Sequence, residues 1–324
     1  MNNKICFYHW NVNGDCWSSR LIVNHIINHT RHLGIEYFYN AHRSINSHCE
    51  DLGLPRENFN VLPYVSDHRG VHLINNVIYV NVWIGFAPSI CWVCLSTLDK
   101  YYNELINDIS KHIGFTIPPI TPVNNGSLVD PYVPFNFSNF DHTVVQKLKE
   151  YVEQKRQTYK KIVLIQNYNV TTTINLNNIP HSQYIYELSL KFPNYQFIPY
   201  MNVSRNCMAV NVAPSEFIFN ECNIQLRNGE AFLYLSYLST LCDKVILLAS
   251  GPALYTFNEE NRHVRGKILL IDGAFIPGIS APSCPINKET QELCACKFNI
   301  CCKYHCYSNY ASLLDCVINF VGDK

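Results

Sequence analysis

The sequence ICFYHWNVNGDCWSSR, residues 5–20, contains the pattern that decides the fold. Its apolar start, Ile5 to His9, is typical of a buried strand, and the glycine of Asn13-Gly14-Asp15 indicates a turn. Helical spacing of apolar residues follows from Ser18 to Leu33, and Gly34 ends it. A strand that passes through a glycine turn into a helix is the opening unit of an α/β domain with a parallel sheet.

The alternation of strands and helices continues along the chain and restarts once. Segment 115–142 is rich in proline and has no usable periodicity, so it separates two α/β halves. We expect strands at residues 36–39, 77–84, 161–165, 195–198, 216–221, 244–249 and 267–272, and helices at 97–113, 144–156, 181–192 and 230–241. The predicted fold class is α/β, with two Rossmann-like domains that face a cleft at the carboxyl ends of their strands.

The restart of the pattern also predicts the domain boundaries. The first Rossmann-like domain covers residues 1–150 and the second covers residues 151–300. Residues 301–324 form a cysteine-rich tail and a last helix, which we expect to return to the first domain.

The composition argues against some classes of partner. The 324 residues include 48 % apolar and 15 % charged residues, and 25 Lys and Arg balance 25 Asp and Glu. A nucleic-acid partner held by phosphate contacts requires a basic excess, so we expect no nucleic acid. The sequence has no apolar run of membrane-spanning length and no signal-peptide core, so we expect a cytoplasmic protein without a transmembrane segment. Frequent Asn, Ile and Tyr suggest an AT-rich genome, as in a large DNA virus or a protist.

Asp15 is the first candidate for chemistry. A carboxylate that follows a strand and a glycine turn lies where α/β sheets bind ligands, with Asn13 and Gly14 beside it. The alternative is that Asp15 caps the helix, because an aspartate accepts hydrogen bonds from the free amides of a first turn. The residues alone leave both interpretations open.

A second candidate is ASGPALYTF, residues 249–257, which follows a predicted strand. Pro252 suits the first position of a helix, and the amides near Ser250 and Gly251, with the helix dipole, make a site for an anion such as a diphosphate. No full phosphate-loop pattern is present, so an ordinary turn between a strand and a helix is the alternative.

In combination, these motifs resemble those of metal-independent glycosyltransferases of the GT-B fold, and among them the heptosyltransferase-like group, glycosyltransferase family nine. In that family a Gly-Asp turn after the first strand supplies the catalytic base, and Gly14 and Asp15 match it. A Ser-Gly-Pro turn, matched by residues 250–252, begins the helix under the donor diphosphate. It follows an element that ends in Cys-Asp-Lys, matched by residues 242–244.

The resemblance implies an enzyme that transfers a hexosyl or heptosyl group from a nucleotide-sugar donor to a hydroxyl group of a glycan or other acceptor, with inversion and without a cofactor. The first domain would bind the acceptor and the second the donor, with Asp15 as the general base. The sequence departs from the family at Ala249 and Tyr255, where the family has Asp and His, and it lacks the usual lysine after the first strand of the second half. A nucleotide-sugar epimerase and an inactive module that binds a nucleotide or sugar are the alternative functions.

Further side chains are candidates for contacts with the donor or acceptor. Asn167, Thr171 and Thr172 follow the first strand of the second half and can bind phosphate or sugar hydroxyls. Trp83 can stack on a sugar ring or belong to the core, and Glu221 can bind a ribose diol or be a solvated strand end. The predicted substrate-binding residues are Asn13, Gly14, Trp83, Asn167, Thr171, Thr172, Glu221, Ser250, Gly251, Pro252 and Tyr255.

The tail sequence CACKFNICCKYHC, residues 294–306, gathers thiols and an imidazole that suit a structural zinc ion. Its spacing lacks the usual C-x-x-C pair, so disulfides and reduced thiols are the alternatives. The candidate zinc ligands are Cys294, Cys296, Cys301, Cys302, His305 and Cys306.

Overall fold

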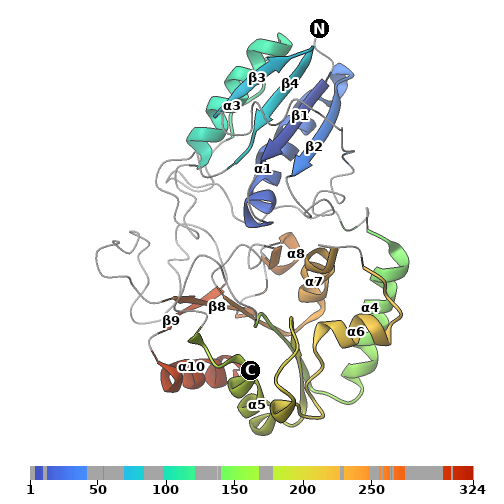
Figure 1. Cartoon of the computed structure of the whole chain (residues 1–324), viewed down its shortest axis with the longest axis vertical. Coiled ribbons are helices and arrows are strands. Elements are labelled where there is room, and N and C mark those ends of the chain that lie inside the picture. The colour runs from blue at the N-terminus through green and yellow to red at the C-terminus, as the bar shows by residue number, and fades with distance from the viewer. Residues whose placement is uncertain are drawn as a thin grey trace. The chain divides into compact units, whose positions relative to one another are not determined.

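The computed structural model of the chain is shown in Figure 1. It describes residues 4–9, 13–41, 54, 69–83, 98–120, 137, 140–167, 178–226, 230–248, 255–256, 258–262, 264, 266–273, 302–307 and 309–323. The chain divides into two compact units: unit 1 is Met1–Phe140 with Arg227–Glu230, and unit 2 is Asp141–Leu226 with Ala231–Lys324. Each unit contains a largely or fully parallel sheet and its helices, so the predicted α/β class with two Rossmann-like units is confirmed. The predicted cleft and the exact domain boundaries stay predictions.

The sheet of unit 1 has the strand order β2-β1-β4-β3. The strands are β1 (Lys4–His9), β2 (Glu36–Ala41), β3 (Val71–Ile74) and β4 (Val77–Asn81). β1 pairs in parallel with β2 and β4, whereas β3 is an antiparallel edge strand. The tight turn between β3 and β4 places Asn75 and Asn76 at φ of 49° and 62°, a left-handed conformation that asparagine tolerates better than most residues.

Two helices, α1 (Asn13–Thr30) and α3 (Leu98–Ile113), form the core of unit 1 with one face of the sheet. Their buried apolar side chains pack with alternate residues of the central strands, including Phe7 and Val80. A 3-10 turn (η1, Arg31–Leu33) extends α1, and Gly34 ends it at φ 68° as the sequence predicts. The helix begins at Asn13 rather than at the predicted Ser18, so the glycine turn is part of its first turn.

The sheet of unit 2 is fully parallel, with the strand order β6-β5-β7-β8-β9. Its strands are β5 (Lys161–Ile165), β6 (Tyr195–Pro199), β7 (Lys244–Leu248), β8 (Ile268–Gly273) and β9 (Cys302–Tyr307). Four of them follow the predicted strands within one or two residues. β9 falls in the expected cysteine-rich tail, and there it extends the sheet.

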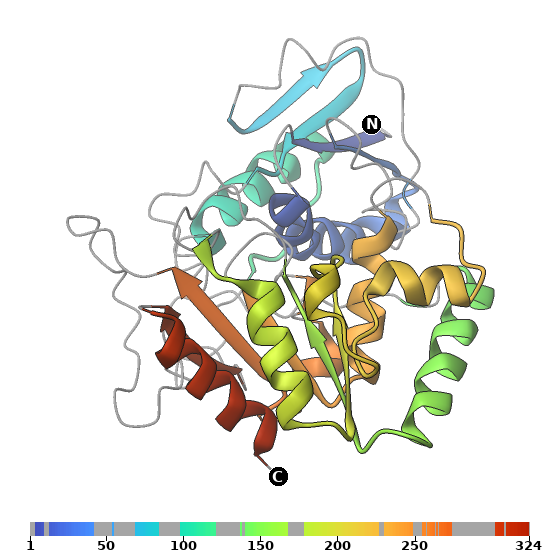
Figure 2. The same ribbon diagram turned by 60° about the horizontal axis from the view of Figure 1, so that its bottom comes forward.

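The helices of unit 2 are α4 (His142–Arg156), α5 (His181–Lys191), α6 (Ser215–Glu221), α7 (Glu230–Leu241), α8 (Glu259–Arg262) and α10 (Tyr310–Gly322), with a 3-10 turn η6 (Arg205–Cys207). α5 and α10 lie side by side on one face of the sheet, as Figures 1 and 2 show, and both contribute to its main core. The buried side of α10, which includes Leu313 and Phe320, is therefore packed within unit 2. The predicted return of the last helix to the first half is not needed to bury this face.

One predicted strand, at residues 216–221, is wrong, because this segment forms helix α6. The buried side chains of the segment are Ser215, Ile218 and Phe219, whereas Phe217 is 55 % exposed. Burial at intervals of three and four residues is typical of a helix that packs one face. The aromatic and β-branched composition of the segment favoured a strand, but packing decided the outcome.

Candidate functional site

Each sheet contains one topological switch point. In unit 1 the chain passes from β1 to β2 on one side, while β4 lies on the other side of β1. In unit 2 the chain passes from β5 to β6 on one side, while β7 lies on the other side of β5. Open parallel sheets bind ligands outside the carboxyl ends of their strands at such points. The topology therefore predicts one ligand site after β1 and β4 and another after β5 and β7.

The segment Asn13-Gly14-Asp15 lies at the first of these points, because it forms the first turn of α1 shortly after β1 ends. Asp15 is the third residue of the helix, and the choice between a base and a cap stays a prediction. One turn further on, Ser19 is fully buried and its hydroxyl lies 2.6 Å from the Tyr39 hydroxyl on β2. Helix α1 therefore packs against β2 one turn after Asp15.

Asn81 and Trp83 lie at the same edge, where β4 ends. The buried side chain of Asn81 accepts a hydrogen bond from the Trp83 amide at 3.1 Å, and the Val82 amide donates to Tyr8 O at 3.0 Å. The Tyr101 hydroxyl of α3 donates to Asn81 O at 2.7 Å. Burial raises the pKa of both Tyr8 and Tyr101, so both hydroxyls keep their protons at neutral pH. The partly buried Trp83 is the predicted site residue whose side chain the structure describes at this edge.

Arg69 is also at this edge, although sequence reasoning missed it. It precedes β3, and the Asn81 amide donates to Gly70 O at 3.0 Å, which sets Arg69 beside the end of β4. Its guanidinium binds the Glu104 carboxylate and lies 5.0 Å from the Tyr101 ring centroid. Two asparagines between β-branched runs at 71–80 are typical of a hairpin, and that signal could have placed Arg69 here.

Two polar residues follow β5 at the switch point of unit 2. Gln166 is fully buried, and its side-chain oxygen accepts from the Leu248 amide at 3.1 Å, which joins the ends of β5 and β7. Asn167 donates to Met201 O at 3.0 Å and accepts from the Met201 amide at 2.7 Å. Both ends of the Asn167 amide thus hold the chain that follows β6. Its predicted contact with a ligand stays a prediction, and the role of Gln166 was not foreseen.

The predicted donor turn is described only at its far end. Tyr255 is buried at 1 % exposure, its carbonyl accepts from the Ser236 hydroxyl, and its ring stacks on Phe232 with centroids 5.9 Å apart. One face of the Tyr255 ring is therefore used in packing against α7. The remaining donor candidates, Thr171, Thr172, Ser250, Gly251 and Pro252, lie outside the described residues.

Glu221 is not brought to the carboxyl edge of unit 2. Its carboxylate lies 3.5 Å from the amino group of Lys155, in the last turn of α4. The next residue after Lys155 is Arg156, which binds Asp243 just before β7. The pair of Lys155 and Glu221 therefore lies near the amino ends of the strands. The proposed contact of Glu221 with a ribose is therefore dropped from the candidate site.

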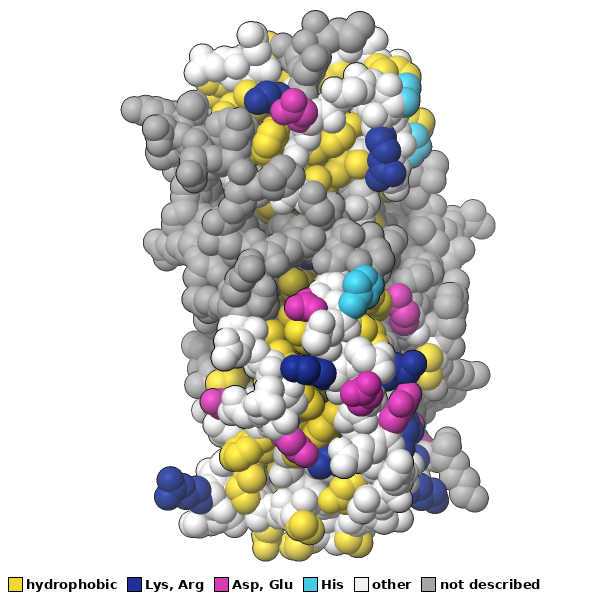
Figure 3. Space-filling view, turned by 90° about the vertical axis from the view of Figure 1, so that its right-hand side faces the viewer, with side chains coloured by type: hydrophobic (Ala, Val, Ile, Leu, Met, Phe, Trp, Pro, Cys, Tyr) yellow, Lys and Arg dark blue, Asp and Glu magenta, His cyan; other side chains and the backbone are white. Residues whose placement is uncertain are grey.

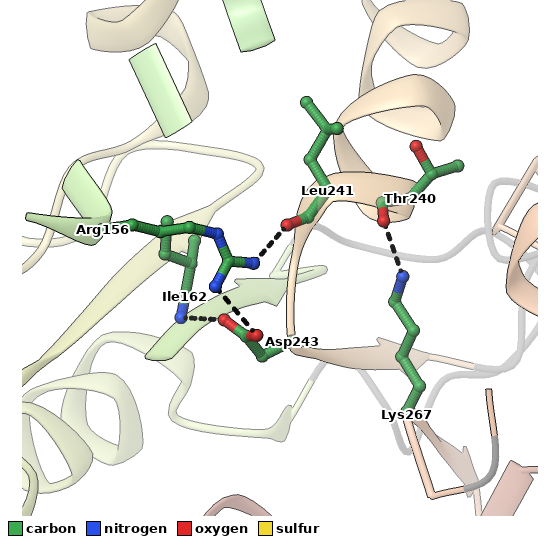
Figure 4. Close-up of polar contacts among 6 residues, drawn as sticks. All are labelled: Arg156, Ile162, Thr240, Leu241, Asp243 and Lys267. Atoms are coloured by element: carbon green, nitrogen blue, oxygen red, sulfur yellow. Dashed lines mark hydrogen bonds and ion pairs between the residues drawn. The ribbon is translucent and has the colours of Figure 1, made fainter. Parts of the chain in front are cut away.

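The Cys-Asp-Lys motif also lies at the amino edge, where it joins three elements, as Figure 4 shows. The Asp243 carboxylate accepts from the Ile162 amide at 2.8 Å and from Arg156 Nη1 at 3.1 Å, and Arg156 Nη2 donates to Leu241 O at 2.9 Å. Lys267 donates to Thr240 O at 3.0 Å, and burial lowers the pKa of this lysine. These contacts fix the starts of β5 and β7 relative to α4 and α7.

Cys242 of that motif is chemically inert by its position. It is almost fully buried, and burial raises the pKa of its thiol to about 12. The thiolate is the reactive form of cysteine, so this side chain stays a neutral, packed group at physiological pH. The motif therefore supports the sheet and does not contribute a reactive group.

The backbone constrains the candidate zinc site. Cys294, Cys296 and Cys301 lie outside the described residues, whereas Cys302, His305 and Cys306 belong to β9. Residues four apart in a strand have Cα atoms about 13 Å apart, too far for both to bind one zinc ion at about 2.3 Å from each sulfur. Cys302 and Cys306 are thus not ligands of the same ion. Within the described part of the chain, no group of three His, Cys, Asp or Glu is arranged to hold a metal.

The face of the molecule seen in Figure 3 has a mixed charge. In the lower part of Figure 3, basic and acidic side chains are interspersed with apolar and neutral groups, without a large coloured patch of either sign. This agrees with the balance of 25 basic and 25 acidic residues in the sequence. Among the helices that the structure describes, none is long and apolar enough to cross a membrane.

The chain has a structural likeness to a known protein. No protein-family model matches the chain, and no curated protein matches its sequence. The structure is similar to the crystal structure of the glycosyl transferase family 9 from Veillonella parvula, at 10 % sequence identity and a TM-score of 0.47. The match covers 98 % of this chain and 90 % of that chain. None of the comparisons supports the viral source that the composition suggested.

Proposed function

We propose that the chain is a metal-independent glycosyltransferase that moves a sugar from a nucleotide-sugar donor to a hydroxyl acceptor, with inversion at the anomeric carbon. Unit 1 binds the acceptor and unit 2 binds the donor. One observation carries the proposal: the motifs of the sequence follow the strands that flank the switch points. Asp15 and Trp83 follow β1 and β4, and Asn167 and residues 249–252 follow β5 and β7.

Asp15 is the general base in this mechanism. As the acceptor oxygen forms its bond to the anomeric carbon, the bond from that carbon to the diphosphate breaks, and Asp15 accepts the hydroxyl proton. Two features support the assignment. Asp15 lies in the first turn of α1, shortly after β1 at the switch point, and the helix N-terminus favours a negatively charged carboxylate there.

The donor side must stabilise the charge that develops on the leaving diphosphate. Residues 250–252 follow β7 in the sequence, and the amides of a helix that begins there would donate to phosphate oxygens. Thr171 and Thr172, in the segment after β5, add hydroxyl donors. The positions of both segments after the two strands of one switch point support this assignment.

A thermal-shift screen tests donor binding in the presence of EDTA. A ligand that binds only the folded protein stabilises it, by about 2.7 kcal/mol at a concentration of 100 times its Kd. We expect at least one of ADP, GDP, UDP and CDP, or a sugar derivative of one, to raise the melting temperature. A flat response to the whole panel would contradict the proposal.

The variant Asp15→Asn tests the base. We expect turnover of the identified donor to fall by about 10²–10⁴-fold, because a positioned general base contributes that much. Donor binding should be retained, as the substitution lies in unit 1. Asp108→Asn is the matched control, since Asp108 is an exposed residue of α3 paired with Lys111. Full activity of Asp15→Asn would exclude the base role. If the unaltered protein binds a nucleotide but turns over no nucleotide sugar, the inactive binding module is favoured instead.

A further inference from the structure

Asn81 has four defined hydrogen-bond partners at the switch point of unit 1, two to its main chain and two to its side chain. It is 1 % exposed, its main-chain N–H donates to Gly70 O, and its main-chain carbonyl accepts from the Tyr101 hydroxyl. Its side chain accepts from the Trp83 amide and also hydrogen-bonds the Tyr8 hydroxyl. One buried residue thus joins β1, the residue before β3, α3 and the segment that leaves β4.

The consequence of this arrangement is a fixed exit from β4. The pairing of β1 with β4 continues through the bond from the Val82 amide to Tyr8 O, and Trp83 is the first residue beyond it. Because the Asn81 side chain holds the Trp83 amide at 3.1 Å, the backbone that carries the indole has one defined direction at the carboxyl edge. A group held in one geometry binds its ligand without the entropy cost of being ordered.

Trp83 is suited to contact a sugar ring at that position. It is partly exposed, and it belongs to the same edge as the first turn of α1. Strand β4 is the immediate neighbour of β1, and neighbouring strands are about 4.8 Å apart. Trp83 therefore lies next to the end of β1.

We propose that Asn81 is a positioning residue, which holds Trp83 as a stacking surface for the sugar ring of the acceptor. The inference rests on the proposed function, which places the acceptor on unit 1. The inference goes beyond the proposed function because it assigns a role to a buried residue that does not touch the substrate. If Asn81 had only a structural role, its replacement would lower the stability of the protein and leave the binding of a sugar to Trp83 unchanged.

The test uses the full chain labelled with 5-fluorotryptophan and observed by fluorine NMR. The chain contains four tryptophans, and Trp83→Phe assigns the signal of Trp83. The probes are methyl β-D-glucopyranoside and methyl α-D-mannopyranoside, titrated to high millimolar concentration. We expect the Trp83 signal to shift with at least one glycoside. In Asn81→Leu we expect the glycoside Kd to rise by about tenfold or more.

Two further variants separate positioning from stability. Asn81→Asp keeps an oxygen that accepts from the Trp83 amide, so we expect near-normal glycoside binding even though a buried carboxylate lowers the melting temperature. Asn211→Leu is the matched control, because Asn211 is a buried asparagine of unit 2 that donates to Ser189 O, Phe192 O and Tyr195 O. It should lower stability and leave the Trp83 response intact.

The outcomes are distinct. The inference is overturned when the unaltered protein shows no Trp83 shift, or when Asn81→Leu retains the shift with an unchanged Kd. It is also overturned when Asn81→Asp binds as weakly as Asn81→Leu. A nucleotide thermal shift that persists in these variants leaves the proposed function standing on its own. The absence of any nucleotide shift in the unaltered protein counts against the proposed function instead.

Discussion

Asp243 links three main-chain segments through a single carboxylate. Replacement by alanine removes the acceptor of the Ile162 amide and of Arg156 Nη1. Removal of the acceptor of a partly buried hydrogen bond typically lowers the free energy of unfolding by about 1–3 kcal/mol. We therefore expect Asp243→Ala to lower the free energy of unfolding of unit 2 by about that amount, measured by urea titration.

The position of Asp243 also predicts what does not change. It lies at the amino edge of the sheet, whereas the proposed donor site lies at the carboxyl edge, so nucleotide binding should be normal while the protein is folded. Glu153→Ala is the control, because the pair of Glu153 with Lys149 is exposed and 3.9 Å long, and exposed pairs contribute about 0–1 kcal/mol. Equal losses in the two variants would show that Asp243 is an ordinary surface acid.

Helix α1 is joined to the segment after α3 by a titratable side chain. His25 Nε2 lies 2.7 Å from Pro118 O, and the ring of His29 lies 4.3 Å from that of His25. Burial lowers the pKa of His25 below the ordinary histidine value of 6.5; the Pro118 bond opposes this shift and His29 adds to it. Between the pKa of His25 in the folded protein and its higher pKa in the unfolded chain, the unfolded chain binds more protons than the folded one. Stability therefore rises with pH across that window and falls on acidification.

The variant His25→Gln isolates this effect, because glutamine can donate to Pro118 O and does not titrate. We expect the unaltered protein to lose more stability than His25→Gln between pH 7.5 and pH 5, as measured by chemical denaturation at each pH. Asn28→Gln, at an exposed position of the same helix, controls for changes in helix propensity. Parallel stability curves for the unaltered protein and His25→Gln would contradict the assignment.

The elements that the sequence predicts well are those whose burial matches their pattern. Strands β5 and β7 are continuous apolar runs because both faces of a parallel sheet are covered, and their limits follow from the residues themselves. β9 was missed because Cys302, His305 and Cys306 were interpreted as candidate metal ligands, although Cys302, Tyr304 and Cys306 alternate with Lys303 and His305. α6 was mistaken for a strand because its aromatic residues suit either structure, and the choice depends on which side chains pack.

The same contrast applies to the candidate site. The sequence predicts Asp15 and Trp83 for the site because each comes shortly after a strand and parallel strands end at a common edge, and their roles stay predictions. Glu221 could not, because its position depends on the mistaken strand. The partners of Asn81 could not be foreseen either, because Gly70 and Tyr101 reach it only through the antiparallel hairpin and the packing of α3. Contacts between distant segments depend on tertiary geometry that spacing alone does not encode.

At the scale of the whole molecule, the two units have separate apolar cores. Ile109 of α3 is fully buried in the core of unit 1, and Leu188 of α5 is fully buried in that of unit 2. Truncation of a buried leucine or isoleucine to alanine typically costs about 2–5 kcal/mol. We expect Ile109→Ala to reduce hydrogen-exchange protection in β1 and β4, and Leu188→Ala to reduce it in β5 and β7, with each substitution leaving the other unit protected.

The double variant tests the independence of these cores directly. Substitutions without shared partners usually add to within about 0.5 kcal/mol, so the combined loss should equal the sum of the single losses. Leu73→Ala and Leu190→Ala are the controls, because these leucines are 45 % and 61 % exposed in units 1 and 2. If either core substitution lowers protection equally in both units, the chain unfolds as one cooperative body. Nucleotide binding would then stabilise β1 and β4 as much as β5 and β7, whereas independent cores confine the effect of a donor to unit 2.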